Sequence, residues 1–237
     1  MINKMCVGKN RPEESHHWFD GMSPMLESQA NLQHSIGLDE SFQIGDWGIF
    51  DEEDLADSPG DENHRFIRGN HDNPAIIKKH SACLGDFGFI GDMDLFFAAG
   101  GFSVDRQRRI AHVDWWPDEE LSAGQWWKAH ELYQKHKPKI MVSHECPNIA
   151  KAPALAACGR NINTGKVYVS GTEMMLQQMY DEHQPELWIF GHYHYKLDTV
   201  IGKTRFICCG SLNIDETNNC LFEVPGLTWP KKMHIIR

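Results

Sequence analysis

The chain has 237 residues, enough for one large domain or two small ones with a substantial hydrophobic core. Its apolar fraction of 41% and charged fraction of 24% exclude a disordered, collagen-like or low-complexity protein. Because 23 basic and 33 acidic side chains leave a net charge of −10, we do not expect an extended surface for nucleic acid or anionic membrane, although a local basic cleft would not show in the sum.

Short apolar or β-branched runs alternate with helical stretches along the chain. The predicted strands are, in chain order, Lys4–Gly8, Ser41–Gly45, Arg65–Arg68, Phe87–Ile90, Leu95–Ala98, Lys139–Ser143, Glu186–Phe190, Lys196–Val200, Arg205–Cys209 and Leu221–Val224. The predicted helices cover about residues 13–32, 74–80, 119–136, 148–157 and 171–183. Strand–helix alternation followed by strand-rich sequence predicts a layered α/β domain with one sheet packed on another.

Local signals refine three of these segments. Capping boxes pair Ser122 with Gln125 and Ser170 with Glu173 at two helix starts. Within the helix over 119–136, we expect one broad packing face, made by Trp126, Trp127, His130, Leu132 and Tyr133. The acidic stretch Asp51–Asp54, followed by Asp57, Asp61 and Glu62, predicts a solvated loop rather than a cation site.

The seven cysteines are odd in number, and none are spaced C-x-x-C. We therefore expect reduced, mostly buried thiols rather than a zinc ribbon or a disulfide framework. Charged residues follow the N-terminal Met1–Gly8 before an apolar signal region can develop, and no run of about 18 apolar residues occurs. These features predict an intracellular, cytoplasmic protein without a membrane span.

The chain has 14 histidines against 12 phenylalanines, so we looked for their positions relative to the strands. Polar residues follow four predicted strands: Asp46, then Asn70-His71-Asp72, then His144, then His192 and His194. The carboxyl ends of neighbouring strands in a layered α/β protein share one edge, where loops converge on a ligand site. We expect the other histidines to be surface or core residues.

The donors at these strand ends are one carboxylate, one amide and imidazoles, without a thiolate. This set suits Mn, Fe, Zn or Ni better than a soft metal or a structural zinc site. The glycines before Asp46, Asn70 and His192 allow the backbone to turn sharply and approach a ligand.

The order of these blocks resembles the calcineurin-like metallophosphoesterase superfamily, whose motifs read D-x-H, G-D, G-N-H-[DE], a lone His and G-H-x-H. The resemblance covers about residues 41–213, and the segments at 65–74 and 113–122 are similar to a small cap-less branch of bacteria and phages. It implies a single domain over residues 1–237, with 1–40 least family-like, folded as a four-layer α-β-β-α sandwich of two mixed sheets flanked by helices. It also implies a metal-dependent hydrolase of phosphate mono- or diesters that uses metal-activated water.

The resemblance assigns roles to individual residues. It implies metal ligands at Asp46, Asn70, His144, His192 and His194, and a catalytic His71 that protonates the leaving oxygen, oriented by Asp72. An alternative for Asp72 is a turn residue before Asn73-Pro74. The segment after Asp46 lacks the D-R-G continuation of protein phosphatases, so a small nucleotide-type ester is favoured as substrate.

The first block departs from the family, because Lys9 and Arg11 stand where a carboxylate and an imidazole ligand belong. Cations there repel a divalent ion, so one firmly bound ion is expected rather than two. Lys9 and Arg11 could instead bind substrate phosphate, as could Arg106, for which a solvated basic face is the other interpretation. Two further alternatives stay open: a protein that binds a phosphoryl ligand or nucleotide without turnover, and a misaligned or altered N-terminal segment.

Overall fold

The computed structural model describes residues 4–10, 40–58, 61–157, 169–194, 196–209, 211–212, 222–225 and 227–237. The predicted helix over residues 13–32 lies outside these ranges, and so does Arg11. Lys9 lies within a described strand, but its side chain is not among the described ones.

The smaller sheet is built around three parallel strands, β1 (Lys4–Asn10), β2 (Glu40–Ile44) and β3 (His64–Ile67). Its order is β10-β1-β2-β3, with the short β10 (Ser211–Leu212) parallel to the end of β1. The strand β11 (Phe222–Pro225) pairs antiparallel with the beginning of β1. The sheet is therefore mixed, as predicted.

The larger sheet has seven strands in the order β12-β4-β5-β6-β7-β9-β8. Its centre is parallel and consists of β5 (Leu95–Ala98), β6 (Ile140–Ser143), β7 (Leu187–Phe190) and β9 (Thr204–Cys208). Antiparallel strands complete both edges: β12 (Ile235–Ile236), β4 (Phe87–Ile90) and β8 (Leu197–Ile201).

The apolar central strands are buried on both faces, which is typical of parallel sheets covered on each side. Along β5, Leu95 and Phe97 point into the core between the two sheets, whereas Phe96 and Ala98 point into the core beneath the helices. Phe42 and Ile44 of β2 contribute to the same inter-sheet core. Alternate side chains of β5 thus pack against the smaller sheet on one face and against the helices on the other.

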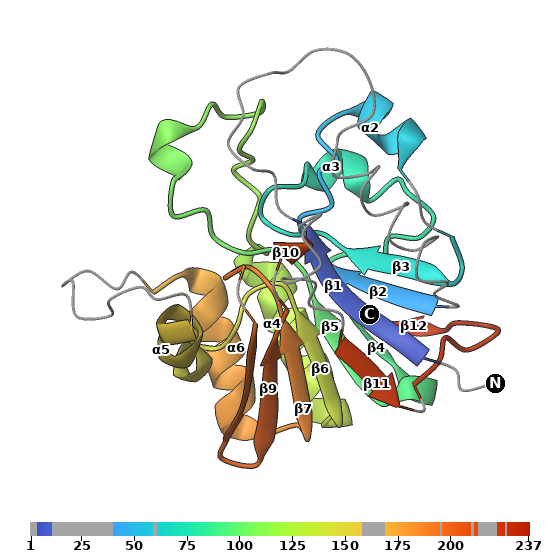
Figure 1. The fold of residues 1–237 in the computed structure, drawn as a ribbon, viewed down its shortest axis with the longest axis vertical. Coiled ribbons are helices and arrows are strands. Elements are labelled where there is room, and N and C mark those ends of the chain that lie inside the picture. Colours follow the sequence, from blue (N-terminus) through green and yellow to red (C-terminus); the bar gives the residue numbers. More distant parts are fainter. Residues whose placement is uncertain are drawn as a thin grey trace.

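Helices cover the outer faces (Figure 1). Three of them, α4 (Ala123–His136), α5 (Asn148–Ala157) and α6 (Gly171–Glu182), lie together on one side of the larger sheet. The shorter α2 (Glu52–Asp57) and α3 (Pro74–Ile77) lie at the end of the smaller sheet. Two 3-10 turns, η1 (Gly91–Met93) and η2 (Arg106–Arg108), complete the described elements. The predicted fold of two mixed sheets flanked by helices is confirmed.

Two local predictions were wrong. The acidic stretch forms helix α2 rather than a loop, because Asp51 accepts hydrogen bonds from the backbone N–H groups of Glu53 and Asp54 and so caps the helix start. Acidic residues in a first turn also interact favourably with the helix dipole. On α4, Trp126 and Tyr133 are buried as predicted, but Trp127 is 65% exposed and lies off the packing face.

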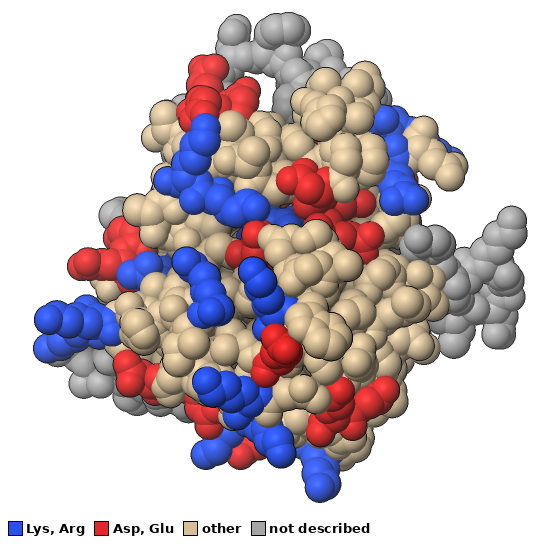
Figure 2. Space-filling view, turned by 180° about the vertical axis from the view of Figure 1, so that it is seen from behind, with Lys and Arg blue, Asp and Glu red and all other residues tan. Residues whose placement is uncertain are grey.

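Basic and acidic side chains are interspersed on the face seen in Figure 2, and neither sign covers that face. In the described part of the chain, no helix is both long enough and apolar enough to span a bilayer.

Candidate functional site

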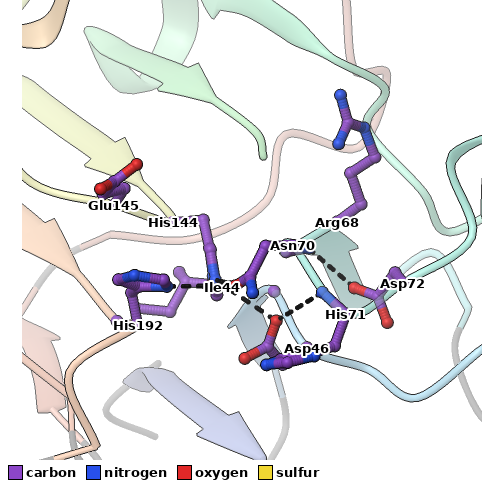
Figure 3. A network of polar contacts seen from close by, with 12 residues as sticks. Ile44, Asp46, Arg68, Asn70, His71, Asp72, His144, Glu145 and His192 are labelled. Carbon is purple, nitrogen blue, oxygen red and sulfur yellow. Dashed lines mark hydrogen bonds and ion pairs between the residues drawn. The ribbon is translucent and has the colours of Figure 1, made fainter. Parts of the chain in front are cut away.

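Four loops, two from each sheet, meet at the carboxyl ends of their strands (Figure 3). Asp46 follows β2 and Asn70 follows β3 in the smaller sheet, whereas His144 follows β6 and His192 follows β7 in the larger sheet. Figure 3 shows these four side chains pointing toward one another, while Arg68 and Glu145 lie at the periphery. The predicted convergence of these strand ends is therefore present.

His144 lies at the centre of the cluster and is fully buried. Its Nδ1 is 2.8 Å from the carbonyl oxygen of Ile44, which can only accept, so Nδ1 carries a proton. Its Nε2 faces two further oxygens, Asn70 Oδ1 at 2.9 Å and Asp46 Oδ1 at 3.3 Å. In the neutral ring, Nε2 therefore presents its lone pair to the same point as these oxygens.

Asn70 joins the two histidines. Its Oδ1 lies 3.1 Å from His192 Nδ1 as well as beside His144. Its Nδ2 donates to Ser103 Oγ at 2.9 Å, and this bond orients the amide with the oxygen toward the imidazoles. We call Asp46 Oδ1, Asn70 Oδ1, His144 Nε2 and His192 Nδ1 the donor cluster, since all four are oxygen or nitrogen atoms of the kind that can coordinate a cation.

The spacing within the donor cluster is compatible with a bound divalent ion. Ligand atoms about 2.0–2.2 Å from a metal lie about 3 Å from their neighbours, close to the 2.9–3.3 Å contacts between these atoms. Among the described residues, no three His, Cys, Asp or Glu side chains form a metal-binding group by themselves, and in the donor cluster the amide oxygen of Asn70 lies beside both histidines. His194 follows two residues after His192 in the same loop and is half-buried.

The backbone of these loops is strained or tightly packed at the residues predicted to be ligands. Asp46, His192 and His194 all have positive φ angles, of 54°, 67° and 65°, which L residues adopt at a cost. At Gly69, a Cβ atom would lie 2.1 Å from Asp46 Oδ1 and 2.7 Å from His144 Cε1. The close approach of the loop after β3 to Asp46 and His144 therefore requires a glycine at position 69.

Asp72 holds two of these loops together. Its Oδ1 accepts from the N–H of Gly48 and its Oδ2 from the N–H of Gly69, each at 2.7 Å. Burial, together with the charge of Asp46, raises its pKa to about 6 despite these hydrogen bonds. Both oxygens of Asp72 thus bind backbone amides of the site loops, and its role in orienting the ring of His71 stays a prediction.

His71 is half-buried beside the donor cluster, and its backbone N–H donates to Asp46 Oδ1 at 3.3 Å. Arg106 has an exposed side chain whose guanidinium carbon is 4.4 Å from the centre of the Phe102 ring. Lys9 occupies a β1 position that pairs with Ser211, and Arg11 lies outside the described residues.

The strand-end pattern missed some residues around the site. They lie in the turn after β5 or are buried glutamates. Ser103 binds Asn70, and its own N–H donates to Glu119 Oε1 at 3.0 Å. The turn Gly100–Ser103 follows a strand of the same sheet edge, so the rule that indicated His144 could have included it. Glu145, buried beside His144, has a pKa raised well above its usual range by burial and by the charge of Glu173.

Glu145 and Glu173 belong to a network that braces the site loops. Glu145 Oε1 accepts from the Ser170 hydroxyl, and Glu173 Oε1 accepts from the hydroxyl of Tyr193, each at 3.0 Å. Lys151 Nζ lies 2.6 Å from Glu173 Oε1 and balances part of this buried charge. Because Tyr193 stands between His192 and His194, the network bears on the loop that carries both histidines.

Comparison with known proteins gives one family match. The model of the calcineurin-like phosphoesterase family matches residues 42–196. The search of curated proteins found no match.

Solved structures show weaker likenesses. A presumed 5′-nucleotidase from Staphylococcus aureus, in complex with alpha-ketoglutarate, is 13% identical with a TM-score of 0.44; the match covers 94% of this chain and 54% of that one. A Thermotoga maritima protein is 11% identical with a TM-score of 0.34, covering 94% of this chain and 99% of that one. A conserved protein from Streptococcus pneumoniae, described as a predicted phosphoesterase, is 11% identical with a TM-score of 0.36, covering 100% and 98%.

Proposed function

The chain belongs to the calcineurin-like phosphoesterase family, and from this premise we propose that it hydrolyses a phosphate mono- or diester in a metal-dependent reaction. The observation that carries the proposal is the donor cluster, in which two oxygens and two imidazole nitrogens lie 2.9–3.3 Å from their neighbours. Because His144 Nδ1 donates to the carbonyl of Ile44, a neutral His144 ring turns the lone pair of Nε2 toward Asn70 Oδ1 and Asp46 Oδ1, and a cation or a proton between them removes this repulsion.

Asp46, Asn70, His144 and His192 would hold one divalent ion, with Mn, Fe, Zn or Ni suited to this donor set. When bound, the ion would polarise the phosphoryl group and lower the pKa of a water molecule. The His144 ring keeps its orientation through the carbonyl of Ile44, and Asn70 keeps its orientation through Ser103. His194 is the fifth proposed ligand, by its place in the loop.

His71 is the proposed catalytic acid. It extends from the loop of Asn70 and is half-buried, so one face of the ring can meet a substrate while the backbone stays bound to Asp46. Its role would be to hold a proton at an imidazole nitrogen and transfer it to the leaving oxygen.

A small nucleotide-type ester is the favoured substrate class. The residues after Asp46 are Trp47, Gly48 and Ile49, and Trp47 is buried and stacked on Phe66 with ring centres 4.6 Å apart. This segment packs the core instead of offering the arginine of the D-R-G motif. Lys9, Arg11 and Arg106 remain proposed contacts for substrate phosphate.

Metal content and turnover test this function together. Purified protein, loaded with Mn²⁺ and desalted, is expected to hold about one ion per chain by mass spectrometry and to hydrolyse bis-p-nitrophenyl phosphate. His144→Ala should lose both properties, because the central ligand is removed. His71→Asn should keep the ion and lose turnover by about 100-fold or more. The matched control is His234→Ala, an exposed histidine far along the chain, which should behave as wild type.

If His144→Ala retained full metal content and activity, the site assignment would be wrong. Two ions per wild-type chain would contradict the single-ion proposal.

The alternative function, binding without turnover, is favoured by Lys9 and Arg11 at the first family motif. The same assay distinguishes it, since one ion with no turnover supports binding alone. Restoration of turnover by Lys9→Asp together with Arg11→His would show that these two residues are the cause.

A further inference from the structure

The loop between β5 and α4 begins against the donor cluster. Asn70 Nδ2 donates to Ser103 Oγ at 2.9 Å, so the loop touches a proposed ligand directly. At Gly101, a Cβ atom would lie 3.1 Å from His144 Cδ2, which shows how closely the loop backbone passes the central imidazole. We call residues 104–109, which follow directly in the chain, the rim of the site.

Three arginines follow in this loop, and they differ in their exposure and in their contacts. Arg106 is exposed and lies over the ring of Phe102, and Arg108 is exposed as well. The side chain of Arg109, by contrast, is only 23% exposed and is held by several partners. Of the three, Arg109 has the guanidinium with the most defined position.

Two aspartates hold Arg109. Its Nε and Nη2 donate to Asp105 Oδ1 at 2.9 Å and Oδ2 at 2.8 Å, a bidentate pair. Its Nη1 donates to the backbone carbonyl of Asp114 at 3.1 Å. A guanidinium has five N–H groups. Within the described part of the chain, three of those of Arg109 donate hydrogen bonds, so two N–H groups remain for another partner.

Arg109 and Asp105 interact electrostatically with residues of the site. Partial burial would lower its pKa, but the hydrogen bond and charge of Asp105 outweigh this and raise it, with smaller contributions from Asp114 and Asp46. The pKa of Asp105 is lowered: burial raises it, but Arg109 and, to a smaller extent, the charge of His71 outweigh burial. The Asp105–Arg109 pair therefore lies within electrostatic reach of both a proposed ligand and the proposed acid.

We propose that Arg109 binds a phosphoryl oxygen of the substrate through its two remaining N–H groups, with Asp105 as its positioning residue. The proposal rests on the proposed function, because it assumes that the phosphate lies at the donor cluster. Arg109 would thus bind phosphate beside the contact already proposed for Arg106, with the difference that its guanidinium is held in place by Asp105 and Asp114. A preorganised guanidinium loses little freedom on binding, and its planar shape suits phosphate oxygens.

Binding of inorganic phosphate to the Mn²⁺-loaded protein tests this proposal by titration calorimetry. Arg109→Ala is expected to weaken phosphate binding by about tenfold or more, since a charge-assisted hydrogen bond is lost. Arg109→Lys keeps the charge and is expected to restore only part of the affinity, because it cannot reproduce the planar geometry. Arg108→Ala, from the same turn, is the matched control and should bind phosphate as wild type.

Metal content and thermal stability of each variant show whether the fold and the donor cluster are intact. An affinity for phosphate within about twofold of wild type in both Arg109 variants would overturn the proposal. So would a loss confined to Arg106→Ala, or a wild-type protein that binds no phosphate. If wild type binds phosphate but turns over no ester, the hydrolase function fails while the assignment of Arg109 is still decided by the variants.

Discussion

Arg68 carries a buried charge directly before the loop of Asn70. Its side chain is only 2% exposed, and its Nε lies 3.0 Å from Asp86 Oδ1. Its Nη1 donates to the carbonyl oxygen of Glu119 at 2.6 Å, which ties the end of β3 to the loop after β5. Because both segments carry site residues, the Arg68–Asp86 pair helps to hold the two site loops in place.

Asp86→Asn is expected to lower the free energy of unfolding at pH 7 by about 3 kcal/mol, since it leaves Arg68 buried without its counter-charge. Burial would raise the pKa of Asp86, but the charges of Arg68 and Lys78 outweigh it and lower the pKa below 3.8. The stabilisation is therefore present above the ordinary pKa and is lost as the pH falls through the lowered value.

Urea unfolding of wild type and Asp86→Asn at pH 7 and pH 3 measures this difference. The control is Asp198→Asn, whose ion pair with Arg205 is half-exposed, and which should change stability by no more than about 0.5 kcal/mol. A difference between wild type and Asp86→Asn that grew as the pH fell would contradict the assignment.

At the scale of elements, local sequence signals were reliable where they act within one turn. Both predicted capping boxes are present, at Ser122–Gln125 and Ser170–Glu173. The predicted strands β4 and β5 have the bounds expected from their apolar runs. Helix α2 was missed, because acidic composition was taken as solvation although Asp51 can cap a helix.

Gly69→Ala tests the close approach of the loop after β3 to the other site loops. The added methyl would lie 2.4 Å from the backbone nitrogen of Asp46 as well as against its carboxylate, so the donor cluster must move apart. We expect loss of Mn²⁺ binding and a destabilisation of about 2 kcal/mol or more.

Gly124→Ala is the matched control, since nothing lies within 4 Å of the added methyl and the position is inside α4. It should stabilise the protein by about 0.5–1 kcal/mol because alanine favours the helix. Calorimetric melting and metal content measure both variants, and unchanged metal binding in Gly69→Ala would refute the packing argument.

At the scale of the molecule, the donor cluster joins the two sheets. Asp46 and Asn70 come from the smaller sheet, and His144 and His192 from the larger one. An ion held by all four would therefore cross-link the layers that otherwise meet only through side-chain packing and hydrogen bonds at this edge. Binding to the folded state alone raises stability by mass action.

Mn²⁺ at about 100 times its dissociation constant is expected to raise the free energy of unfolding by about 2.7 kcal/mol. This corresponds to an increase in melting temperature of several degrees, reversed by a chelator. His144→Ala should remove the increase, whereas His234→Ala should retain it. An equal increase in His144→Ala would mean that Mn²⁺ stabilises the fold at another place.

Most strands, both capping boxes and the candidate site residues could be predicted from the sequence, because apolar runs and capping boxes act locally and polar strand ends share one edge in an α/β fold. The short strands β10 and β12 could not be predicted in this way. The partners that the site residues meet across the chain followed from the tertiary structure alone. Asp72 binds the amides of Gly48 and Gly69, and Ser103 orients Asn70. Arg109 rather than Arg106 is fixed at the rim, by Asp105 and Asp114. Such contacts depend on how loops from separate strands pack, which no periodicity in the sequence records.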